Sequence, residues 1–122
     1  MKKTYETGLW GEDVAQTYLE HEHGMSCLEH RYRTKCGEID LIMLDQETVV
    51  FVEVKTRKTG QAGDGLSAVN TQKQKRIVRS ALLYLVKKGW MRRTVRFDLI
   101  EIHERDILYV PNAFQPYGQF YH

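Results

Sequence analysis

The chain has 122 residues, of which 42% are hydrophobic and 28% are charged. This length is typical of one domain, so we expect a single domain over residues 1–122, and the composition is too apolar for a disordered chain. No apolar run approaches the roughly 20 residues of a membrane span, which argues against a membrane partner. The basic N-terminus leads into no apolar segment, so no secretory signal is predicted and a cytoplasmic location is expected.

The net charge is only +2, but the basic residues are unevenly distributed. Between Lys55 and Arg93 the chain carries eleven basic residues and one acidic residue, Asp64. If the fold gathers these side chains on one surface, that surface attracts phosphate backbones. The alternative is a solvated helix face with scattered charge, and the count alone does not decide between the two.

The N-terminal pattern predicts a helix over Tyr5–His23, ended by Gly24 in the left-handed cap position. The expected buried face of this helix contains two glycines, each of which costs roughly 1 kcal/mol relative to alanine inside a helix. Close approach of the helix to a sheet would account for them, and it would bring Glu12 into the interior. The residues of this expected face are Gly8, Gly11, Glu12, Ala15, Tyr18 and Leu19.

Three strands are predicted next, over Ser26–Arg33, Glu38–Leu44 and Val49–Thr56. The third is rich in β-branched and aromatic residues and is apolar on both faces, which is typical of a central strand. A segment with three glycines, Thr59–Gly65, then predicts a loop that is too long for a tight hairpin.

A second helix is predicted over Leu66–Lys88, ended by Gly89, with one apolar stripe and otherwise basic faces. Strands over Val95–His103 and Ile107–Val110 follow, and Pro111 ends the last one. The order of helix, three strands, helix and two strands predicts an α/β fold with a mixed sheet flanked by helices. The expected apolar stripe consists of Val69, Ile77, Val78, Ala81, Leu82, Leu85 and Val86.

A cluster of charged residues on these elements is the candidate site. Glu53 and Lys55 lie two apart on the third predicted strand, so their side chains project from the same face. Antiparallel pairing about the turn at Asp45–Thr48 brings Asp40 close to the position opposite Glu53. Glu12 can supply a third carboxylate from the inward face of the first helix. Each residue alone is more often a surface charge or salt-bridge partner, but the combination is far more specific.

Neighbouring carboxylates repel each other, and a hard divalent cation with oxygen ligands relieves that repulsion. The cluster therefore predicts a Mg²⁺ or Mn²⁺ site with Asp40, Glu53 and Glu12 as ligands. Such an ion can polarise a phosphoryl oxygen and lower the pKa of a bound water. Lys55 can orient that water or offset charge on the phosphate, so the site suits hydrolysis of phosphodiester bonds.

Other charged residues have two interpretations each. Arg57 continues the face of Glu53 outward and could contact phosphate. Lys73 shares a helix face with apolar residues, so it either points toward the acidic site or extends past the stripe into water. Glu38, two residues before Asp40, is either an extra ligand or an exposed acid. The predicted nucleic-acid-binding residues are Arg57, Lys73, Lys75, Arg76 and Arg79.

The pattern resembles the restriction-endonuclease-like, or PD-(D/E)XK, superfamily, which has an acid on one strand and Glu-x-Lys on the next. More closely, it resembles the small bacterial YraN-like family, related to archaeal Holliday-junction resolvases. The resemblance implies an αβββαβ core and places Glu12, Asp40, Glu53 and Lys55 on metal-binding and catalytic positions. The matching segments are residues 8–12, 37–42, 51–57, 96–99 and 112–114, together with Val69 and Lys73.

These observations lead to a first expectation, a Mg²⁺- or Mn²⁺-dependent endonuclease. The expected substrate is nucleic acid, with DNA favoured over RNA and with branched or repair intermediates as candidates. Symmetric cleavage of a junction needs two active sites, so a homodimer is compatible with this expectation. The alternative is a non-catalytic nucleic-acid-binding or scaffolding protein, because a fold alone does not assign chemistry. A metal-dependent enzyme for a small substrate is a third interpretation, but the chain has no glycine-rich phosphate loop opening a helix.

Overall fold

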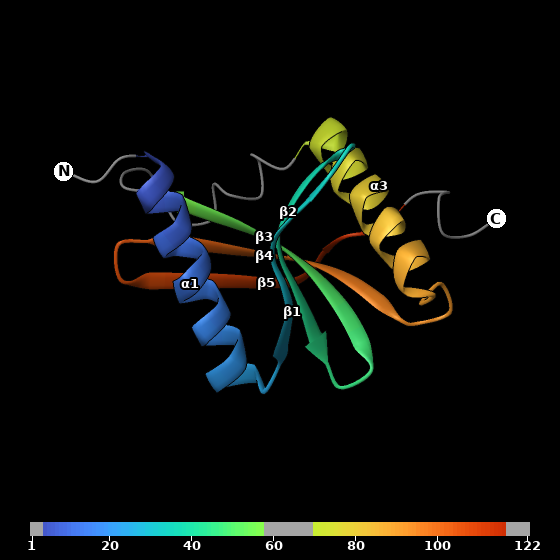
Figure 1. Ribbon diagram of the computed structural model, residues 1–122. Coiled ribbons are helices and arrows are strands. Elements are labelled where there is room, and N and C mark those ends of the chain that lie inside the picture. Colours follow the sequence, from blue (N-terminus) through green and yellow to red (C-terminus); the bar gives the residue numbers. More distant parts are fainter. Residues whose placement is uncertain (1–3, 58–69, 117–122) are drawn as a thin grey trace.

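The computed structural model describes residues 4–57 and 70–116, with side chains from Trp10 onward. A five-stranded mixed sheet carries helix α1 on one face and helix α3 on the other (Figure 1). None of the helices in these two ranges is long and apolar enough to cross a membrane. The elements in chain order are α1 (Thr4–His23), β1 (Ser26–Thr34), β2 (Gly37–Asp45), β3 (Thr48–Arg57), α3 (Thr71–Lys88), β4 (Val95–His103) and β5 (Asp106–Phe114).

The strands lie in the order β1-β2-β3-β4-β5. All neighbours are antiparallel except β3 and β4, which are parallel and therefore need a long crossover that contains α3. The predicted order of elements and the predicted α/β class with an αβββαβ core are confirmed. The described part of the second helix begins at Thr71, where the Asn70 side chain accepts a hydrogen bond from the Lys73 N–H at 2.9 Å. The predicted loop at residues 59–65 and the predicted start of this helix lie outside the described residues.

The last strand is longer than predicted. It does not end at Val110 but continues through Pro111 to Phe114. Among the described residues β5 lies at the edge of the sheet beside β4, so a residue without an N–H group can be accommodated. A register shift opposite β4 and the positive φ of 54° at Asn112 accompany the proline.

Two apolar cores lie on opposite faces of the sheet, one under α3 and one under α1. The stripe predicted for α3 is wrong at Val86, which is 60% exposed, and it omits Tyr84, which is 1% exposed. Successive helix residues are rotated by about 100°, so the face centred on Ala81 reaches Tyr84 and Leu85 and turns away at the next residue. The predicted member Val69 lies outside the described residues.

Gly11 lets α1 lie close to the sheet. A Cβ atom built at this glycine would lie 2.2 Å from Cγ2 of Thr56 in β3, far below any permitted contact. The expected close approach of helix and sheet is therefore confirmed at Gly11. The next residue, Glu12, is carried into the interior and is only 4% exposed.

Candidate metal and nucleic-acid site

The candidate site forms where β2 separates from β3. Backbone pairing of these strands runs from the Asp45–Thr48 pair to the Leu41–Val52 pair and ends there. At the next position the Asp40 side chain, through Oδ2, accepts the hydrogen bond of the Val54 N–H at 2.8 Å. Figure 1 shows the β1–β2 hairpin running on toward the start of α3, while β3 runs toward α1. The carboxylate of Asp40 is therefore held at the junction of the two branches.

Asp40 and Glu53 meet at this junction, as the hairpin register predicted. Glu53 follows Val49 and Phe51 along the face of β3 that α3 covers, and its side chain is 7% exposed. Burial, together with the charge and a hydrogen bond of Glu53, raises the pKa of Asp40 from 3.8 to about 9. Asp40 therefore keeps its proton to a pH well above its ordinary range, because two close negative charges in a buried site repel each other.

Arg31 binds the third carboxylate, that of Glu12. Its Nε lies 3.0 Å from Oε1 and 3.2 Å from Oε2 of Glu12, and this hydrogen bond raises the pKa of Arg31. The charge of Glu12 also contributes, as the smallest cause, to the raised pKa of Asp40. Arg31 lies in β1 at φ 56°, between two residues that pair with Ile39 and Leu41. It therefore stands opposite Asp40, a position that the tight β1–β2 turn could have revealed in the sequence.

The carboxylates differ in how well they are placed for an ion. Within the two described ranges, no group of three or more His, Cys, Asp and Glu side chains converges closely enough to hold a metal. Asp40 and Glu53 are adjacent, whereas Glu12 is engaged by Arg31. Mg²⁺ is commonly bound by one or two carboxylates, with water and substrate phosphates completing the shell. The donor set of Asp40 and Glu53 therefore fits such an ion, and Glu12 as a third ligand stays a prediction.

Lys73 reaches the same site from the first turn of α3. Its ammonium group contacts Oε2 of Glu53, so of its two interpretations the structure supports the inward one. Lys55 is partly exposed and lies two residues beyond Glu53 on the same strand. The remaining predicted basic residues of α3 are exposed, and they are Lys75, Arg76 and Arg79.

Two further predicted residues have carboxylate or guanidinium partners. The Nε of Arg57 lies 3.0 Å from Oε1 of Glu101, a residue of β4 that is 1% exposed and that the sequence analysis did not single out. Glu38 lies 3.1 Å from Nη2 of Arg33 at the edge of the hairpin. This contact favours the interpretation of Glu38 as a surface acid over that of an extra ligand.

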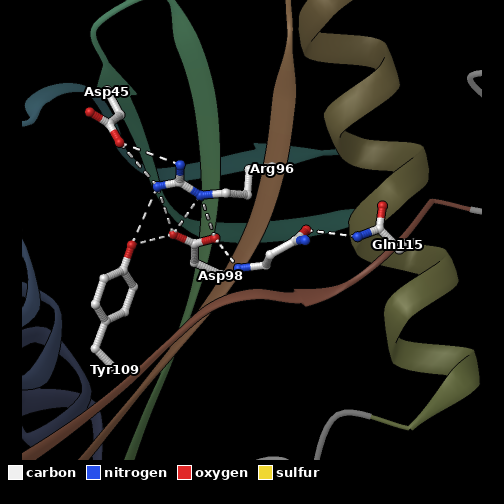
Figure 2. Close-up of polar contacts among 6 residues, drawn as sticks. Asp45, Arg96, Asp98, Tyr109 and Gln115 are labelled. Atoms are coloured by element: carbon white, nitrogen blue, oxygen red, sulfur yellow. Dashed lines mark hydrogen bonds and ion pairs between the residues drawn. The ribbon is translucent and has the colours of Figure 1, made fainter.

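A separate buried carboxylate, Asp98, ties β4 to β5 (Figure 2). Asp98 is fully buried and accepts hydrogen bonds from Arg96 Nε at 3.0 Å, from the Asn112 N–H at 2.8 Å and from the Tyr109 hydroxyl. Arg96 reaches on to Asp45 at 3.3 Å, at the turn between β2 and β3. Burial and then the bond to Asp98 raise the pKa of Tyr109. Asp98 has its partners within this network, so we assign it a structural role.

Comparisons with known proteins identify the family to which the chain belongs. A protein of Geobacter metallireducens is 42% identical over 112 residues, which cover 88% of this chain and 91% of that protein. One from Alkaliphilus metalliredigens is 43% identical over 88% of this chain and 96% of its own length, and one from Chlorobium chlorochromatii is 46% identical over 82% and 76%. All three bear the name UPF0102 protein. Residues 11–102 also match the sequence model of the uncharacterised protein family UPF0102, and the chain therefore belongs to this family.

Proposed function

We propose that this protein is a metal-dependent nuclease of the PD-(D/E)XK superfamily that hydrolyses phosphodiester bonds in DNA. The observation that carries the proposal is the Asp40–Glu53 pair at the point where β2 leaves β3. Burying two carboxyl groups side by side is costly for a fold, because close negative charges repel each other, and a bound divalent cation relieves that repulsion. Lys55, two residues further along β3, supplies the remaining member of the Glu-x-Lys pattern.

Mg²⁺ or Mn²⁺ bound by Asp40 and Glu53 would supply a Lewis acid for the phosphoryl group and a water of lowered pKa. Three residues of the chain have roles of their own beside the ion. The Val54 N–H fixes the orientation of Asp40. Lys55 carries a positive charge that offsets the charge developing on a phosphate. Arg31 holds the buried carboxylate of Glu12 in place through its Nε.

The exposed basic residues of α3 support a nucleic-acid substrate. Lys75, Arg76 and Arg79 are exposed on the helix that also brings Lys73 to the carboxylates. Cationic side chains beside an acidic site draw a phosphate backbone toward it. The resemblance to junction resolvases favours DNA, in particular branched intermediates, and a cytoplasmic homodimer belongs to the same proposal.

Cleavage assays test the proposal directly. The purified chain is incubated with junction, nicked, linear and single-stranded DNA, in Mg²⁺, in Mn²⁺ and in a chelator. We expect metal-dependent cleavage that Asp40→Asn and Glu53→Gln abolish. Glu47→Gln is the matched control, since it removes an exposed carboxylate from the turn of the same β2–β3 hairpin. Absence of metal-dependent cleavage on every substrate, or cleavage that both site variants retain, would contradict the proposal.

A second candidate is a protein that binds nucleic acid without cutting it. The ion pairs favour this alternative, because Lys73 balances Glu53 and Arg31 balances Glu12 without any added ion. A site of this kind can persist on a nuclease fold as structure alone. Salt-dependent DNA binding with no turnover in either metal would support it. Cleavage that is lost in Lys55→Met would exclude it.

A further inference from the structure

We propose that Lys73 is an internal counter-cation for the carboxylate pair, displaced by the divalent ion and then free to bind a substrate phosphate. This inference rests on the proposed function and adds to it a residue outside the Glu-x-Lys pattern. It also gives the bound metal and the bound nucleic acid a physical connection. The metal would displace the Lys73 side chain from Glu53, and the nucleic acid would then bind it.

The contact between Lys73 and Glu53 places an ammonium group on a metal ligand. The Glu53 side chain is 7% exposed, and leaving such a buried carboxylate unpaired is strongly unfavourable. Lys73 supplies the missing positive charge at Oε2. A divalent ion bound to the same carboxylate would repel the ammonium group of Lys73, so the two cations compete for Glu53.

The Lys73 side chain can leave Glu53 without unfolding any element. It is 34% exposed, so its far end has a route to water. The lysine side chain is a flexible four-carbon stem that ends in a compact ammonium group, whereas an arginine ends in a rigid planar guanidinium. The backbone beneath it is fixed, because Asn70 caps the helix at the Lys73 N–H and Ser80 contacts the Thr34 hydroxyl at 2.9 Å. Release therefore requires only a change of rotamer.

The place of Lys73 in α3 determines where a released ammonium can go. Lys75 and Arg76, two and three residues further on, are exposed on the same helix. A phosphate backbone drawn to these cations passes close to the first turn, where it offers Lys73 a new anionic partner. Binding of DNA and binding of metal should then strengthen each other, since coupling between two ligands is reciprocal.

Metal affinity measured without any cleavage tests the inference. Mn²⁺ is titrated into the full chain and the free ion is followed by electron paramagnetic resonance. We expect Lys73→Gln to bind Mn²⁺ roughly fivefold or more tightly than the wild type, which is the lower end of usual coupling between sites. Lys87→Gln removes the same charge from the exposed last turn of the same helix and should keep the wild-type affinity. Lys73→Arg retains the counter-charge and should not gain affinity.

A second titration adds a short DNA duplex with phosphorothioate linkages. The duplex should tighten Mn²⁺ binding by the wild type and do so less in Lys73→Gln. Unchanged or weaker Mn²⁺ binding by folded Lys73→Gln, checked by its thermal transition, would overturn the inference. If the wild type binds Mn²⁺ and Asp40→Asn does not, the proposed metal site stands even when the inference fails. If neither the wild type nor Lys73→Gln binds Mn²⁺, both are overturned.

Discussion

Just beyond the last paired residues of β2 and β3, the N–H of Val54 donates a hydrogen bond at 2.8 Å to the carboxylate of Asp40. This bond gives the Val54 N–H a partner at the point where β2 leaves β3. An N–H left without a partner there would be costly. The same bond fixes the carboxylate that the proposed chemistry requires. One side chain therefore both closes the edge of the β2–β3 ladder and begins the candidate site.

Stability of the metal-free protein should fall as pH rises toward about 9. Burial and then the charge of Glu53 raise the pKa of Asp40 from 3.8 to about 9. Between these values the folded state holds a proton that the unfolded state has lost, so the free energy of unfolding decreases with increasing pH. Urea denaturation in a chelator across this range measures the slope. Asp40→Asn should flatten the slope, and an equally steep slope in that variant would contradict the assignment.

Gly11→Ala should destabilise the protein by roughly 1–3 kcal/mol, the usual cost of overpacking, although alanine favours a helix. The new Cβ would lie 2.2 Å from Cγ2 of Thr56, so α1 must shift away from β3. Urea denaturation of a double-mutant cycle is the measurement. Thr56→Ser removes the clashing methyl group and should recover most of the loss, whereas additive effects of the two changes would argue against this contact.

Local patterns in the sequence were sufficient to predict the parts of the site that depend on short-range geometry. The turn between β2 and β3 fixes the hairpin register, and this register places Asp40 beside Glu53. A glycine at the centre of a helix face predicted the close approach at Gly11, and that approach carries Glu12 inward. These inferences needed only the periods of helices and strands.

The partners of the charged residues could not be predicted in the same way. Pairs such as Arg57 with Glu101 and Lys73 with Glu53 join elements that are distant in the sequence, so they depend on how α3 and β4 pack. Strand periodicity puts Arg96 and Asp98 on the same face of β4, but periodicity alone does not predict that the Asp98 carboxylate is fully buried. That burial depends on donors from β5, which continues past the proline that was expected to end it.

Asp98→Ala should destabilise the fold by roughly 3–5 kcal/mol, the cost of removing one partner of a buried ion pair. The change leaves the Asn112 N–H without its carboxylate acceptor, leaves Arg96 with Asp45 as its remaining carboxylate partner, and loosens β5. Chemical denaturation measures the decrease in the free energy of unfolding. Mn²⁺ affinity below the unfolding transition should be unchanged, because Asp98 has a structural role, and selective loss of metal binding by a folded variant would contradict that role.

Lys55→Met should lower the cleavage rate by on the order of 100-fold while leaving Mn²⁺ affinity intact. The ammonium is assigned to charge that develops on the phosphate during reaction, and loss of one such group typically costs a factor of 10²–10³ in rate. Methionine has nearly the length of the lysine side chain but no charge, and residue 55 is partly exposed, so the strand should tolerate the change. Single-turnover cleavage at saturating metal separates this effect from binding. A rate that is restored by additional Mn²⁺ would instead assign Lys55 to the metal site.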